Sequence, residues 1–182
     1  MGIKDIFTKF VPSRFRKPDD EGPDSAVLLL RELHFFAEQE LRGAAERAWN
    51  RTFEDNKESR HFIVQQSIVT FVQVGPHMLN ILHRDAPYLE IGDAELEGFL
   101  PEKERREAWR AHHAWCAIDY LELSKNTDEQ TKYCVLSALA AEMVDENCCG
   151  VWMPKVRYFI PKGPVLYPEL KRIGSSREVN LD

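Results

Sequence analysis

Residues 61–83 constrain the fold most, because they favour strands that follow one another directly along the chain. Their sequence, HFIVQQSIVTFVQVGPHMLNILH, is rich in the β-branched and aromatic residues that fit the pleated surface of a sheet. Residues 65–67 form a polar break in this run, and Gly75 and Pro76 are a turn signal. We therefore expect two or three antiparallel strands joined by tight turns.

Further strands and helices are expected on both sides of this group. The apolar run AVLLLRE at 26–32 is bounded by turn residues and predicts a buried strand. Apolar residues recur with helical spacing in 35–50, in 93–111 with a break at Pro101, and in 127–146. The remaining expected elements are strands at 112–123, 148–153 and 156–160 and a helical turn at 167–173. This order predicts an α+β fold with a single mixed or antiparallel sheet and helices packed mainly on one face.

The chain is long enough for one domain with a substantial core. It has 182 residues, of which 43% are hydrophobic. Residues 18–25, PDDEGPDS, are polar and contain two prolines and a glycine, which is typical of a linker. We therefore divide the chain into a basic amphipathic N-terminal arm with its linker at 1–25, a single α+β domain at 26–174 and a flexible tail at 175–182.

Composition and charge argue against several classes of protein. The formal net charge of -6 is unfavourable for binding nucleic acid, because phosphate contacts need a basic surface. No run of apolar residues reaches the roughly 18 residues of a membrane-spanning helix, and no secretory signal is recognisable. The four cysteines lie in apolar segments and are expected to be reduced core thiols. We expect a cytoplasmic protein that needs no cofactor, since no phosphate-binding or dinucleotide-binding motif is present.

Residues 1–17 differ in charge from the rest of the chain. They carry five basic side chains and one acidic one, and their apolar residues fit one side of a short helix. Such a helix suits weak contact with an anionic membrane surface or with a partner. The simpler interpretation is a helix that covers an exposed part of its own core.

Several short motifs of the C-terminal half occur in a recognisable order. Residues 86–96 place a proline before an acidic helix, and Trp109, His112 and His113 lead from a helix into a strand. The long helix then ends in Ala-Ala-Glu at 140–142, and the strand Cys-Gly-Val-Trp follows at 149–152. In this order the chain resembles bacterial domain-of-unknown-function family 4261. The resemblance implies an α+β fold, but no activity and no catalytic residues.

A thiol enzyme is one chemical hypothesis. Cys116 or Cys149 would be the nucleophile, and His113 or His83 would be its base. Asp119 adds a carboxylate near the expected end of a strand. No nucleophile motif is present, so these residues are candidates on the basis of their chemistry alone.

A metal site is the second chemical hypothesis. His112, His113 and Cys116 are of the types that zinc prefers as ligands. Neighbouring strand residues point to opposite faces, so only one of the two histidines can face a given site. There is no pair of cysteines with zinc spacing, and ordinary packing is therefore the preferred interpretation.

These observations favour a non-enzymatic protein-interaction module. It would contact an unknown protein partner, or a second copy of itself, through a face or an edge of the sheet; residues 77–83 are a candidate exposed strand for self-association. The alternatives are a small thiol- or metal-dependent hydrolase and a peripheral membrane-associated module that uses residues 1–17.

Overall fold

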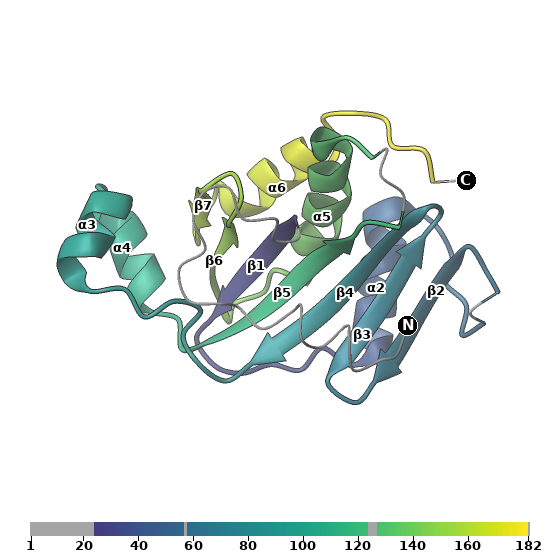
Figure 1. The fold of residues 1–182 in the computed structure, drawn as a ribbon, viewed down its shortest axis with the longest axis horizontal. Helices are drawn as coiled ribbons and strands as arrows, with labels where there is room; N and C mark the ends of the chain where they lie inside the picture. The colour runs from purple at the N-terminus through teal and green to yellow at the C-terminus, as the bar shows by residue number, and fades with distance from the viewer. Residues whose placement is uncertain (1–23, 57, 124–126, 182) are drawn as a thin grey trace.

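The computed structural model describes residues 24–56, 58–123 and 127–181, and within them it has an α+β fold (Figure 1). The predicted residues 1–17 lie outside these ranges. The strands are β1 (Ser25–Leu30), β2 (His61–Gln66), β3 (Val69–Val74), β4 (His77–Arg84), β5 (Ala114–Leu121), β6 (Cys148–Met153) and β7 (Tyr158–Pro161). The helices are α2 (Glu38–Trp49), α3 (Asp93–Phe99), α4 (Lys103–Arg110), α5 (Glu129–Met143) and α6 (Leu166–Gly174).

All seven strands form one antiparallel sheet in the order β2-β3-β4-β5-β1-β6-β7. The predicted fold class is confirmed, and of the two sheet types the antiparallel one is present. Residues 61–83 yield three strands, because Ser67 adopts a positive φ of 47° and turns the chain between β2 and β3. Pro101 separates α3 from α4, as its position in the sequence predicts.

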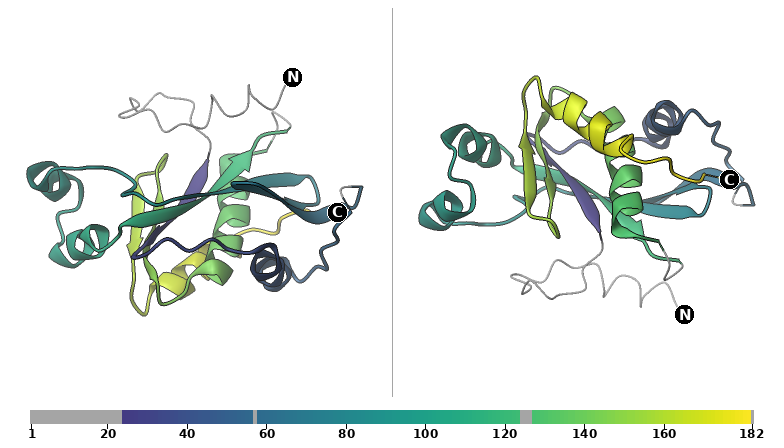
Figure 2. Two further views of the ribbon diagram at one scale, coloured as in Figure 1. Left: turned by 90° about the horizontal axis from the view of Figure 1, so that it is seen from below. Right: turned by 90° about the horizontal axis from the view of Figure 1, so that it is seen from above.

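One face of the sheet, the inner face, is covered by α2, α5 and α6 (Figure 2). Helix α5 contacts β1 and β5 and is flanked by the other two helices, so most of its residues are buried. Strand residues alternate between the two faces, and Leu28 and Ile118 lie in the same inner core as Leu136 of the helix. The prediction of helices mainly on one face is therefore confirmed.

The opposite, outer face is covered only in part. Trp109 of α4 packs edge-on against Trp152 of β6 and Phe159 of β7, with ring centroids 5.8 and 5.5 Å apart. These contacts hold the α3–α4 hairpin at the β6–β7 end of the sheet (Figure 1). Over β2, β3, β4 and most of β5, no helix of the described ranges covers the outer face (Figure 2).

Residues 175–181, which lie in the predicted flexible tail, pack against the rest of the domain. Val179 and Leu181 are partly buried against the inner core, and the Asn180 carbonyl lies 3.1 Å from Nε2 of His77. Gly75 has a φ of 56°, and a side chain there would collide with the Leu181 carbonyl. The tail therefore contacts the turn between β3 and β4.

Gly150 is the glycine whose close packing is easiest to test. A Cβ atom there would lie 2.6 Å from the Phe159 ring and 2.7 Å from the Ile160 carbonyl oxygen. We predict that Gly150→Ala lowers the free energy of unfolding by about 1–3 kcal/mol, measured by urea denaturation.

Gly98 provides the control, since a Cβ atom in this position of α3 meets no atom within 4 Å. Gly98→Ala should raise the free energy of unfolding by up to about 1 kcal/mol through helix propensity. Equal effects of the two substitutions would contradict the packing described for β6 and β7.

Candidate functional site

The adjacent histidines take different positions from those expected of strand residues. His112 continues the last turn of α4, because its backbone N–H donates to the Trp109 carbonyl at 3.3 Å, and β5 begins only at Ala114. The His112 ring is buried: Nε2 accepts the Tyr88 N–H at 3.0 Å, and Nδ1 contacts the Trp109 carbonyl. His113 is exposed. The buried histidine thus links α4 to the segment after β4.

Cys116 and His83 are Cα partners across β5 and β4 and share the inner face. Burial raises the pKa of the fully buried Cys116 thiol, and the negative charges of Asp119 and Cys148 raise it further. Burial lowers the pKa of His83 from 6.5 to about 4. At neutral pH the thiol is therefore protonated and the imidazole uncharged, whereas a nucleophilic cysteine needs its thiolate.

Cys149 and Asp119 lie apart from this pair. Cys149 packs in the aromatic cluster beneath α4, and burial raises the pKa of its thiol against the opposing effect of Arg31. Asp119 is three residues after Cys116 in the same strand and so points to the outer face. Hence His113, Cys116, Cys149 and Asp119 are not brought together. In the part of the chain that the structure describes, no group of three or more His, Cys, Asp or Glu side chains is arranged to hold a metal ion.

Asp119 has polar neighbours on the outer face. The Ser25 hydroxyl of β1 donates to its carboxylate at 2.6 Å, and Asn80 of β4 is its Cα partner on the other side. Burial raises the pKa of Asp119 from 3.8 to about 6, although the Ser25 hydrogen bond opposes this shift. The carboxylate is mostly ionised at neutral pH, and it carries its charge in a poorly solvated position.

Asn80 is the functional candidate that the sequence analysis missed. Only 2% of the residue is exposed, and its side-chain oxygen Oδ1 is buried without a hydrogen-bond partner among the described residues. A buried acceptor without a partner costs about 1–3 kcal/mol, so such groups need an explanation. The detectable signal was a single amide within the otherwise apolar stretch 78–82 of β4.

Apolar side chains surround this polar pair. In strand register, Val64, Phe71, Asn80, Asp119 and Ser25 form one row across β2, β3, β4, β5 and β1. The neighbouring rows are mostly apolar. We call the following side chains the outer patch: Phe62, Val64, Val69, Phe71, Met78, Asn80, Leu82, Ala117 and Asp119.

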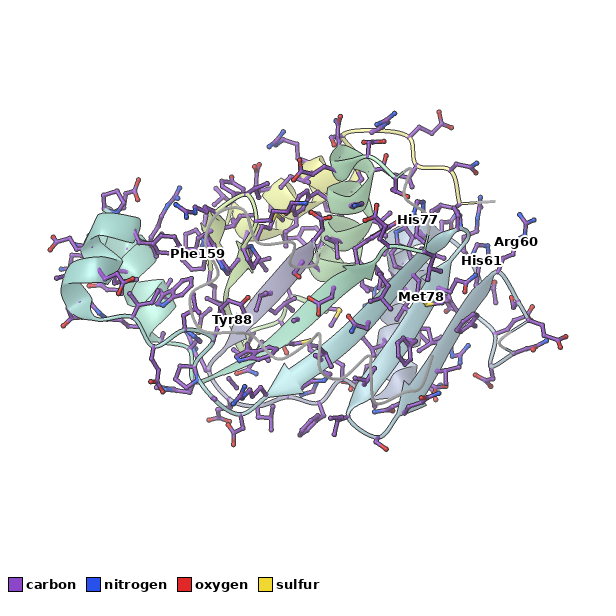
Figure 3. All side chains as sticks on the ribbon, viewed as in Figure 1. Arg60, His61, His77, Met78, Tyr88 and Phe159 are labelled. Carbon is purple, nitrogen blue, oxygen red and sulfur yellow. The ribbon has the colours of Figure 1, made fainter. Side chains whose placement is uncertain are left out.

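Tyr88 marks the boundary of the outer patch. Its ring packs edge-on against Trp115 at 5.5 Å, and burial together with the Asp119 charge raises its pKa to about 12. Beyond it begins the aromatic cluster under the α3–α4 hairpin. The outer patch thus extends from this cluster to the edge strand β2, and Met78 lies at the end of the patch away from Tyr88 (Figure 3).

A second polar cluster lies where β1 begins. Lys132 of α5 is 3.2 Å from Asp24 and 3.1 Å from Glu122, and Lys155 is 3.0 Å from Asp24. Asp24 and Lys132 are both buried. Because these charges satisfy one another, the cluster anchors β1 to α5 and is not a binding site.

A hollow between α3 and α4 has a volume of about 420 Å³ and is lined mainly by charged residues. Its arginines are already engaged: Arg110 lies 2.6 Å from Asp93, and Arg106 lies 3.8 Å from Glu97. These side chains are mostly exposed, and such surface pairs contribute little energy. The outer patch therefore remains the stronger candidate.

The comparisons with known proteins found no match: no family model, no curated protein and no solved structure resembles this chain at a significant level. The resemblance to domain-of-unknown-function family 4261 therefore stays a prediction. Within the described ranges, no helix is long and apolar enough to cross a membrane.

The burial of the cysteines predicts low reactivity. We expect none of the four thiols to react with a chromogenic disulfide reagent at neutral pH in the native protein, and all four to react in denaturant. The measurement is absorbance of the released thiolate. Rapid labelling of Cys116 or Cys149 under native conditions would support a thiol enzyme instead.

The lowered pKa of His83 predicts a measurable pH dependence of the free energy of unfolding. Its folded-state pKa of about 4 lies below the usual 6.5, so the unfolded chain binds this proton more readily. The stabilisation is complete above pH 6.5 and is lost progressively as the pH falls from 6.5 to about 4. Between pH 7 and pH 4 the wild type should lose about 2–3 kcal/mol more than His83→Gln.

This difference is obtained by urea denaturation of both proteins at each pH. Other buried histidines titrate in both proteins alike, so their contributions cancel. If the two proteins lost stability in parallel, His83 would not be the partly buried neutral imidazole described.

Proposed function

We propose that this protein is an interaction module, not an enzyme, and that it binds a basic, amphipathic segment of a partner protein on its outer patch. The observation that carries the proposal is the buried, unpartnered Oδ1 of Asn80 in the middle of an apolar sheet surface. A ligand that supplies a donor there and apolar groups around it would satisfy both features.

An apolar sheet face is normally covered by another layer of structure. On the inner face that layer is formed by α2, α5 and α6, whereas no helix of the described ranges covers the outer patch. Val64, Phe71, Met78 and Leu82 there are partly buried side chains with apolar surface remaining. Partly exposed apolar side chains around a buried polar centre are typical of a protein-binding site.

The β2 edge of the sheet is less suited to binding than the face. On β2, the Gln65 N–H donates to the Glu38 carboxylate at 3.3 Å, and the His61 carbonyl accepts the Glu54 N–H at 3.0 Å. Covered edges resist pairing with another chain. The prediction that residues 77–83 are an exposed strand for self-association is wrong, because β4 lies between β3 and β5 and has no free edge.

The chemistry of the polar centre favours a cationic partner. Asn80 Oδ1 and the Asp119 carboxylate are both acceptors, and Asp119 carries most of a negative charge at neutral pH. A lysine or arginine would donate to both groups and would lower the cost of the buried charge. The overall net charge of -6 also attracts a basic segment over longer distances.

The candidate thiols support this proposal over the thiol-enzyme alternative. Burial raises the pKa values of both Cys116 and Cys149, and neither has been brought next to His113. A thiol enzyme would need a group that is accessible and readily ionised.

Selection from a phage library of random peptides tests the proposal. We predict that the full chain enriches peptides that combine lysine or arginine with apolar residues, and that Phe71→Asp weakens their binding at least about tenfold, as expected for a central interface residue. Affinities are measured by fluorescence anisotropy of the labelled synthetic peptides.

Tyr167→Asp is the matched control, because Tyr167 is an exposed aromatic residue on α6, which covers the inner face. It should leave the affinity unchanged. Peptides that bind both variants equally well, or a selection that enriches no peptide, would contradict the proposal.

A further inference from the structure

We propose that the outer patch has an intramolecular ligand: residues 1–23 of the same chain bind there and compete with the partner segment. This inference rests on the proposed function in one respect, because the partner segment named there is the competitor. Docking of the arm needs no partner and is tested on the chain alone. Residues 1–23 lie outside the described ranges; the inference rests on their sequence and on the point at which they join the domain.

The arm has the chemistry that the outer patch would select. Its apolar residues lie on one side of the predicted helix: Ile3, Ile6, Phe7, Phe10 and Val11. Five basic side chains and one acidic one accompany them in residues 1–17. This is the basic, amphipathic pattern inferred for the partner from Asn80 and Asp119. A short helix with this composition is marginal in water and is stabilised when its apolar side is covered.

The arm joins the domain beside the outer patch. Asp24 is held by Lys132 and Lys155, and the next residue, Ser25, donates its hydroxyl to Asp119 at 2.6 Å. The chain therefore enters the sheet at the end of the row that contains Asn80. The attachment point is fixed by buried contacts, which raises the effective concentration of the arm at the patch.

The arm is also long enough to reach every part of the patch. The distance from β1 to β2 is four strand spacings, or about 19 Å. Residues 18–23, the part of the linker before Asp24, span up to about 20 Å when extended. A helix over residues 3–11 adds about 13 Å. The helix can therefore lie across β3 and β4 on the outer face.

Occupation of the patch by the arm would regulate partner binding. A tethered ligand that fills the site in about nine of ten molecules weakens the apparent affinity of a competitor about tenfold. The partner must displace the arm, and substitutions that weaken the arm should tighten partner binding by the same factor.

Methionine methyl NMR tests docking in the full chain without any partner. The four methionines include Met78 in the outer patch and Met143 and Met153 in the inner core. A nitroxide label is attached to Thr8→Cys, on the polar side of the predicted arm helix, after mass spectrometry confirms that the native cysteines remain unlabelled. We expect the Met78 signal to be broadened more strongly than the Met143 and Met153 signals.

Two variants and one control make the result specific. Phe71→Asp should abolish the selective broadening of Met78, whereas Tyr167→Asp should retain it. If Phe71→Asp fails to fold, the arm variant Phe7→Asp with Phe10→Asp gives the same expected loss without any change in the domain. This arm variant should also bind a selected peptide about tenfold more tightly than the wild type.

Absence of selective Met78 broadening would overturn the proposal, and so would broadening that persists in the arm variant. An arm that leaves Met78 unaffected but sediments the chain with phosphatidylcholine–phosphatidylglycerol vesicles would be a membrane contact instead. The NMR measurement contains no partner, so the two proposals can fail separately. Selective Met78 broadening without any enriched peptide would disprove only the proposed function. Enriched peptides without selective Met78 broadening would disprove only the docking of the arm.

Discussion

The position of β1 is the constraint on which the rest of the structure depends. This strand lies between β5 and β6, and all six of its residues are buried. Ala26 and Leu28 belong to the inner core, while Val27 and Leu29 belong to the outer aromatic cluster. Both cores therefore share one strand. Without β1, strands β2–β5 and the β6–β7 hairpin would not be joined in one sheet.

The start of β1 is fixed as firmly as its middle. The Asp24 carboxylate forms ion pairs with Lys132 and Lys155, and the Asp24 backbone carbonyl accepts the Tyr120 N–H at 2.8 Å. Buried ion pairs of this kind often contribute less to stability than their number suggests, because both charges lose their hydration. Their clearer effect is positional, since they determine the register of β1 and the point from which the N-terminal arm departs.

Local features of the fold followed from the sequence, whereas the strand order did not. Pro101 lies between α3 and α4 as predicted, whereas the break predicted at residues 65–67 lies at residues 67–68, because Gln65 and Gln66 still belong to β2. The pairing of β1 with β5 joins residues such as Ser25 and Asp119, which are 94 positions apart. Periodicity within a segment carries no information about such a distant partner. The start of β5 was also misplaced, because His112 completes the last turn of α4 before the strand begins.

The candidate site shows the same division between chemistry and placement. Asp119 and Cys116 were both chosen for their chemistry, but alternation along β5 sends them to opposite faces, so they cannot act together. Asn80 was overlooked because its neighbours are apolar, yet it lies directly opposite Asp119 in the ladder. A carboxylate and an amide oxygen in this position lower the stability of the protein without a ligand, because both groups lose their hydration. A cationic ligand would donate to both oxygens, whereas an apolar segment without a donor would leave both unsatisfied. The polar pair would therefore favour a cationic partner over an uncharged one. For the proposed ligand, the polar pair would thus give the outer patch selectivity at a cost in stability, a balance expected of a surface that binds a particular segment.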